Sequence, residues 1–102
     1  MATVFSLENK FEPAEEITWR DVESELIVLY LPTGEYYTFN EIGKLTWNLL
    51  IDNNTIGSIL ETISNEYDMS FENIKKDVNT FITGLLENNL IKKRRRLNEK
   101  KV

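Results

Sequence analysis

An uninterrupted run of six apolar residues, at positions 26–31, constrains the fold more than any other feature of the sequence. A strand with one solvated face alternates apolar and polar residues, whereas a short continuous apolar run is typical of a strand covered on both faces. The run is too short to span a membrane, and nowhere do 18 apolar residues follow one another. We therefore expect residues 26–31 to form the central strand of a sheet, covered on both faces.

A strand pattern lies on each side of this run, at residues 17–22 and 35–39. In the second of these, Tyr37 and Phe39 share one face, and the alternate residues share the other. The connections are short, and the second contains Pro32-Thr33-Gly34, in which the glycine can adopt a positive φ. These features predict a three-stranded antiparallel meander whose order in space follows the sequence.

Three helical patterns follow the strands. Each comes after a residue that commonly caps a helix N-terminus, namely Asn40, Thr55 and Ser70. Each then repeats apolar residues at a spacing of three to four, which gives the helix one apolar stripe. Because a small meander cannot cover its own apolar face, the helices must do so. We expect an α+β, winged-helix-like domain: a three-stranded antiparallel meander followed by a three-helix bundle.

Charge is distributed unevenly along the 102 residues, whose net charge is −5. Residues 92–102 carry a net charge of +6, and residues 1–91 carry −11. A chain of this length forms one domain. We expect a flexible acidic N-terminal arm at residues 1–16, the folded domain at residues 17–91 and a basic, solvated C-terminal tail at residues 92–102, whose role the sequence leaves open.

Cysteine and histidine are both absent. Their absence removes thiolate nucleophiles, imidazole bases and most transition-metal sites, and the serines have no histidine to activate them. The glutamates of the arm follow no calcium-loop spacing. We therefore expect no enzyme, no bound metal and no cofactor. The first residues contain no signal-peptide pattern, so we expect a cytoplasmic location.

The strand at residues 35–39 is the most informative segment for function. In a meander it lies at an edge of the sheet, yet it contains no lysine, proline or bulge that would protect its free backbone groups. Such an edge can accept an extended peptide as an additional strand. Alternatively, the N-terminal arm covers it. The residue pattern alone does not distinguish these two interpretations.

DNA binding is the competing hypothesis, because three short-linked helices beside a small sheet resemble a winged helix. The third helical pattern, which would enter the major groove, contains Glu72, Asp77 and Glu87 against Lys75 and Lys76. It offers no arginine for guanine recognition. A winged-helix transcriptional regulator is therefore the weaker alternative.

The segment from Gly34 to Leu50, GEYYTFNEIGKLTWNLL, resembles the PqqD-like family, in which G-x-Y-Y-x-L-N-x-x-G-x-x-I-W-x-L-L joins the last strand to the first helix. The resemblance continues through Thr55-Ile56, Glu66-Tyr67-Asp68 and Asn89-Leu90-Ile91. It covers roughly residues 17–91. Phe39 replaces the more common leucine, and Leu45 stands one place before the usual apolar position.

The resemblance implies a peptide chaperone, or RiPP recognition element, that binds the leader of a ribosomally made precursor peptide by strand addition. The leader would be presented to a modifying enzyme, such as a radical SAM protein or a lasso-peptide peptidase. The pathway stays open between pyrroloquinoline quinone synthesis, a lasso peptide and another cyclised product, and the oligomeric state between a monomer and a strand-swapped dimer. The expected peptide-binding residues are Tyr36, Tyr37, Thr38 and Phe39 on the strand, and Lys75, Val78, Asn79 and Ile82 on the third helix.

Overall fold

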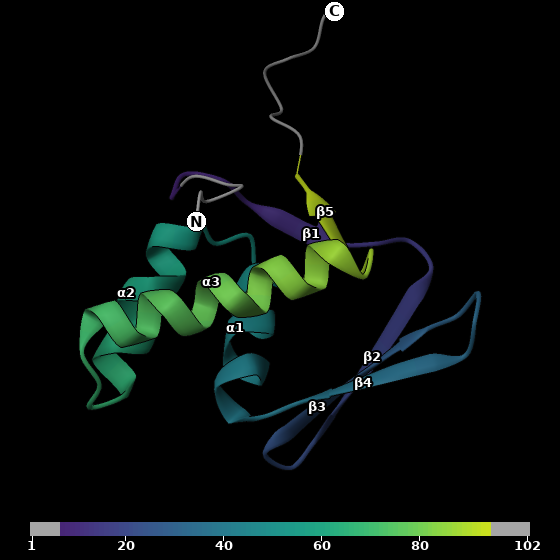
Figure 1. Ribbon diagram of the computed structural model, residues 1–102, viewed down its shortest axis with the longest axis horizontal. Coiled ribbons are helices and arrows are strands. Elements are labelled where there is room, and N and C mark those ends of the chain that lie inside the picture. Colours follow the sequence, from purple (N-terminus) through teal and green to yellow (C-terminus); the bar gives the residue numbers. More distant parts are fainter. Residues whose placement is uncertain (1–6, 95–102) are drawn as a thin grey trace, which may run out of the picture.

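The computed structural model describes residues 7–94 and contains three helices and two antiparallel sheets (Figure 1). The expected α+β architecture, with a meander followed by three helices, is confirmed. The elements are β1 (Phe11–Pro13), β2 (Ile17–Val22), β3 (Glu25–Tyr30), β4 (Glu35–Phe39), α1 (Glu41–Ile51), α2 (Ile56–Glu66), α3 (Phe71–Glu87) and β5 (Ile91–Lys93).

The three-stranded sheet has the order β2-β3-β4, so the apolar run at residues 26–31 does lie in the central strand. Its two hairpin turns use left-handed backbone conformations. Glu23 has a φ of 54° in the β2–β3 turn, and Gly34 has a φ of 79° in the β3–β4 turn. The Gly34 N–H donates to the Tyr30 carbonyl at 2.9 Å, which closes the second turn as the Pro32-Thr33-Gly34 sequence predicts.

Each helix begins where the sequence predicts. The side chains of Asn40, Thr55 and Ser70 accept hydrogen bonds from the backbone N–H three residues later, in the first turns of α1, α2 and α3. These caps satisfy donors that have no partner within the helix. None of these helices is long and apolar enough to cross a membrane, a statement that covers residues 7–94.

The core lies between the helices and one face of the three-stranded sheet. Leu26 and Val28 point into it from β3, and Trp47 of α1 is completely buried against the Trp19 ring of β2, edge to face at 5.4 Å. The alternate residues of β3, Ile27 and Leu29, are only half-buried. The expectation that this strand is covered on both faces is therefore wrong, because the helices pack on one side only and the sheet extends beyond them (Figure 1).

A second sheet, which the sequence did not predict, joins the two ends of the described chain. β1 pairs antiparallel with β5, with Phe11 opposite Lys93 and Pro13 opposite Ile91. The Phe11 side chain is 1% exposed and belongs to the core. The folded part therefore extends beyond residues 17–91 on both sides, into the expected arm and the expected tail.

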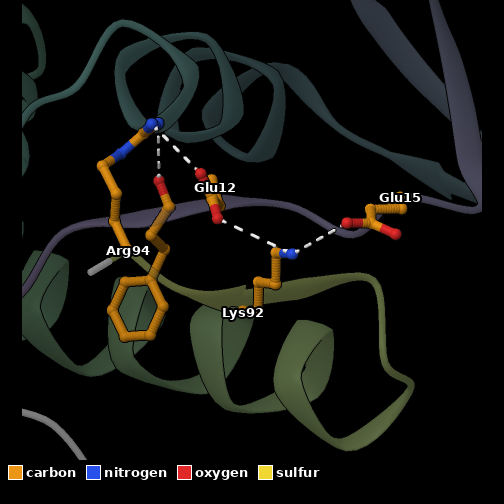
Figure 2. Close-up of polar contacts among 5 residues, drawn as sticks. Glu12, Glu15, Lys92 and Arg94 are labelled. Atoms are coloured by element: carbon orange, nitrogen blue, oxygen red, sulfur yellow. Dashed lines mark hydrogen bonds and ion pairs between the residues drawn. The ribbon is translucent and has the colours of Figure 1, made fainter.

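Ion pairs flank this small sheet (Figure 2). The Arg94 guanidinium lies 3.2 Å from the Glu12 carboxylate and also donates to the Phe11 carbonyl at 3.2 Å. The Lys92 ammonium lies 3.8 Å from Glu12 and 3.5 Å from Glu15. The acidic and basic end segments thus neutralise each other where they meet. The remainder of the predicted basic tail, residues 95–102, lies outside the described residues.

Candidate functional site

β4 is an edge strand. Within residues 7–94 it pairs with β3 and with no other strand. The described part of the N-terminal arm does not cover it, because β1 pairs with β5 and the carbonyls of Leu7 and Asn9 accept hydrogen bonds from Gly57 and Ile56 at the start of α2. Residues 7–16 therefore lie elsewhere, while residues 1–6 fall outside the described chain.

Alternate residues of β3 form their backbone hydrogen bonds to β2 and to β4, and one hydrogen bond shows which residues bond to which strand. The Leu31 N–H donates to the Glu16 carbonyl at 2.9 Å, just beyond the register that pairs β2 with β3. In an antiparallel sheet these bonds alternate from residue to residue. Odd-numbered residues of β3 therefore direct their backbone groups towards β2, and even-numbered residues direct theirs towards β4.

The same alternation determines which backbone groups of β4 are free. Val28 lies opposite Tyr37, so the odd-numbered residues of β4 form the hydrogen bonds to β3. Tyr36 and Thr38 consequently direct their N–H and C=O groups away from the sheet. An extended peptide that approached this edge would meet two donors and two acceptors already in strand geometry.

The side chains of β4 divide between the two faces of the sheet. Tyr36, 69% exposed, and Thr38 point away from the helices, whereas Tyr37 and Phe39 are half-buried on the helix-facing side. Partial burial, followed by the nearby Glu35 carboxylate, raises the pKa of the Tyr37 phenol above its ordinary value. Tyr37 is therefore a neutral hydroxyl at physiological pH and can both donate and accept a hydrogen bond.

An aromatic contact connects the end of β4 to α3. The Phe39 and Phe81 rings meet edge to face, with centroids 4.9 Å apart and an interplanar angle of 89°. Gly43 of α1 lies beneath them. A Cβ at position 43 would stand 2.9 Å from the Phe39 Cβ and 3.2 Å from the Phe81 ring. The close approach of α1, β4 and α3 at this point therefore requires glycine.

The four expected helix residues, Lys75, Val78, Asn79 and Ile82, do not include Phe81, the α3 residue that meets β4. Val78 and Ile82 are 1% and 0% exposed and form part of the core, so their side chains do not reach an open groove. Lys75 is exposed and Asn79 is half-buried. At 100° per residue, Asn79 lies on the side of the helix opposite Phe81, and Lys75 lies about 120° away from it. Of the strand residues, Phe39 meets α3 at Phe81, which is not one of these four.

The α3 flank nearest β4 is instead marked by Phe81 and its helical neighbours Asp77 and Gly84. A Cβ built on Gly84 meets no atom within 4 Å, so the space beside this turn is open. The sequence did contain a signal for this flank: a glycine inside a helical pattern is unfavourable, and its presence calls for a local reason. Phe81 is half-buried and packs at the margin of the core.

The site combines the edge of β4 with three aromatic side chains. Across the described part of the chain, no group of three carboxylates could hold a metal ion. The backbone groups of Tyr36 and Thr38 provide hydrogen bonds that do not depend on sequence, and the Tyr37, Phe39 and Phe81 rings provide apolar surface. This arrangement suits capture of an extended peptide.

DNA binding finds no support in this geometry. The exposed residues of α3 include Glu72 and Asp77 beside Lys75 and Lys76, so the helix offers phosphate little net attraction. Of the three basic residues described near the C-terminus, Lys92 and Arg94 are paired with Glu12 and Glu15. None of the similarities reported below points to a DNA-binding protein.

Two solved structures share this fold. One is TbiB1 in complex with the TbiA(beta) leader peptide, with a TM-score of 0.75, 22% identity and coverage of 79% of this chain and 94% of that chain. The other is lasso peptide synthetase B1 complexed with the leader peptide, with a TM-score of 0.76, 22% identity and coverage of 81% and 98%. No curated protein matches the chain. A family model described as coenzyme PQQ synthesis protein D (PqqD) matches residues 25–91, which is more than half of the sequence, and the chain therefore belongs to the PqqD family.

Proposed function

We propose that this protein is a peptide chaperone that binds the leader of a ribosomally synthesised precursor peptide as a fourth strand beside β4. The observation that carries the proposal is the free edge of β4, where Tyr36 and Thr38 direct their backbone groups outwards. Membership of the PqqD family supports it, as does the fold shared with two proteins whose structures contain leader peptides.

The alternation of the added strand gives it two different sets of contacts. Leader residues opposite Tyr37 and Phe39 point to the helix-facing side, towards the Phe81 flank of α3. Leader residues opposite Tyr36 and Thr38 point to the other side of the sheet. Specificity then comes from the helix-facing side chains, because the backbone bonds are the same for every sequence.

Affinity must exceed the cost of ordering a flexible peptide. Each backbone hydrogen bond contributes a net of about 0.5–1.5 kcal/mol, and the residues on the edge of β4 offer four such groups. That sum is modest after the loss of translational and conformational freedom on binding. A few buried apolar anchors beside the Phe39–Phe81 contact therefore supply most of the affinity.

In this proposal the protein acts without catalysis. It holds the leader near a modifying enzyme, so that the enzyme meets the attached core peptide at a high effective concentration. The enzyme is a radical SAM protein or a peptidase of the lasso-peptide type, and the complex assembles in the cytoplasm, where ribosomal precursors are made. No cofactor or metal has a role in this step.

The proposal is tested by titrating the isotopically labelled protein with a synthetic leader from the precursor gene beside its own. The amide resonances of Tyr36 and Thr38 should shift in a saturable manner and become protected from hydrogen exchange. The resonances of α2, at the end of the molecule opposite the three-stranded sheet (Figure 1), serve as the internal control. If saturating leader leaves the β4 amides unchanged, β4 is not the binding edge.

A further inference from the structure

The outer face of the three-stranded sheet, which points away from the helices, has an unusual composition. An antiparallel sheet with one solvated face normally carries polar residues on that face. Here the centre is apolar, with Ile27 and Leu29 half-exposed on β3 and Tyr36 exposed on β4. The face is formed by Thr18, Arg20 and Val22 of β2, Glu25, Ile27 and Leu29 of β3, and Tyr36 and Thr38 of β4.

The run at residues 26–31 has the pattern of a strand buried on both sides, yet within residues 7–94 the chain covers only one of them. Every outward-pointing side chain of this sheet is exposed or half-exposed. Contiguous apolar surface of this kind marks an interaction site in a soluble protein. No segment among residues 7–94 covers Ile27 and Leu29 on this side of the sheet.

The charges on this face indicate what kind of molecule it suits. Arg20 and Glu25 are its only ionisable acidic or basic residues, and Arg20 takes part in none of the ion pairs formed among the described residues. Protein interfaces are depleted of lysine and acidic residues at their centre and enriched in tyrosine and arginine. The face thus fits a protein surface with an apolar centre and a carboxylate opposite Arg20.

The face is also continuous with the proposed leader site, since both use β4. A leader strand added beside β4 would extend the sheet, and its residues opposite Tyr36 and Thr38 would project onto this same outer face. With leader bound, the outer face of the sheet is therefore one strand wider than in the free protein. A partner that binds this face contacts both the protein and the leader.

We propose that the outer face, centred on Ile27, Leu29 and Tyr36, docks the modifying enzyme and that bound leader completes this docking surface. The inference rests on leader binding at β4, and it adds the surface of this protein on which the modifying enzyme binds. In this arrangement the helix-facing side chains of the bound leader are recognised by this protein. Its outward-pointing side chains are recognised by the enzyme.

The test uses the full chain, a fluorescently labelled synthetic leader and the modifying enzyme encoded beside the precursor. Leu29→Lys places a charge at the centre of the outer face, and Asn65→Lys places the same charge on exposed α2 as the matched control. Should Leu29→Lys fail to fold, Ile27→Thr removes apolar surface while keeping a β-branched side chain suited to a strand. Leader affinity is measured by fluorescence anisotropy, and processing of the whole precursor by its kcat/KM.

We expect Leu29→Lys to bind leader within about two-fold of the native chain but to lower kcat/KM of processing at least about ten-fold, with Asn65→Lys unchanged. Binding of the enzyme should be tighter to the leader-loaded than to the free protein. Unchanged processing by a folded variant overturns the inference, as does an equal loss of leader affinity. A native dimer that Leu29→Lys dissociates also overturns it, because a second copy then covers the face. Failure of the native chain to bind leader is a separate result that counts against the proposed function.

Discussion

The Phe39 and Phe81 rings, at the end of β4 and in the middle of α3, meet edge to face with an interplanar angle of 89°. This contact fixes the distance between the free strand edge and the helix beside it. Beyond it, towards Gly84, the surface of α3 is open. The spacing between β4 and α3 at the proposed leader site is therefore determined by packing within the protein, before any peptide binds.

The two glycines near this contact should respond in opposite ways to alanine. Gly43→Ala places a methyl group 2.9 Å from the Phe39 Cβ, so we expect a loss of about 1–3 kcal/mol in the free energy of unfolding. Gly84→Ala meets open space inside a helix and should raise stability by about 0.5–1 kcal/mol. Chemical denaturation measures both. Equal effects of the two substitutions would contradict the packing described at Gly43.

Proline substitutions should distinguish the two sides of β4. The Thr38 N–H points away from β3, so Thr38→Pro removes a donor for the leader and should weaken leader binding about ten-fold or more while the fold persists. The Tyr37 N–H faces β3, so Tyr37→Pro should disrupt the hairpin itself. Circular dichroism reports folding, and anisotropy reports affinity. A folded Thr38→Pro variant with native affinity would rule out pairing at this position.

The sheet formed by β1 and β5 should depend on its buried ring more than on its ion pairs. Phe11 is fully buried, and Phe11→Ala should cost about 3–5 kcal/mol of stability. Glu12→Gln breaks contacts between side chains that are 30–49% exposed, so its cost should stay below about 1 kcal/mol and decrease with added salt. Thermal unfolding at two salt concentrations checks both. If Glu12→Gln lost more stability than Phe11→Ala, the ion pairs and not the buried ring would be the main source of stability of this sheet.

The ionisation of Tyr37 should report on Glu35. Burial and the Glu35 carboxylate raise the Tyr37 pKa in the folded chain, so Glu35→Gln should lower that pKa towards the ordinary value. Because the folded pKa is the higher one, the stability from this group is full below about pH 10 and is lost as the pH rises beyond it. Phenolate absorbance during a pH titration, with Tyr37→Phe as the reference, measures the shift. An identical titration of the Glu35→Gln variant would remove Glu35 as a cause.

Local patterns predicted most of the fold. The three N-caps and the left-handed Gly34 are determined by neighbouring residues, so the boundaries of α1, α2, α3 and the second hairpin could be predicted from the sequence. The pairing of β1 with β5 could not. A three-residue strand is too short to show a periodic pattern, and the paired residues are about 80 positions apart in the sequence. Burial of Phe11 in the folded core is what brings β1 beside β5.

The edge position of β4 in the candidate site could be predicted from the order of the strands in the sequence. The flank of α3 that faces this edge could not. A meander makes β4 an edge whatever its side chains are, so the position of Tyr36 to Phe39 on an edge strand could be predicted, and their role in peptide binding stays a prediction. Which flank of α3 faces that edge depends on the rotation of the helix about its axis. That rotation follows from the packing of Phe81 over Gly43, a contact between residues distant in the sequence.

The pairing of β1 with β5 also brings together two positions near the ends of the described residues. The Arg94 N–H donates to the Lys10 carbonyl at 2.8 Å, so residues 10 and 94 are adjacent. A segment with neighbouring ends can be spliced into a loop of a host protein with little distortion of either partner. The chain is accordingly suited to transplantation into an unrelated enzyme, with the free margin of β4 left available.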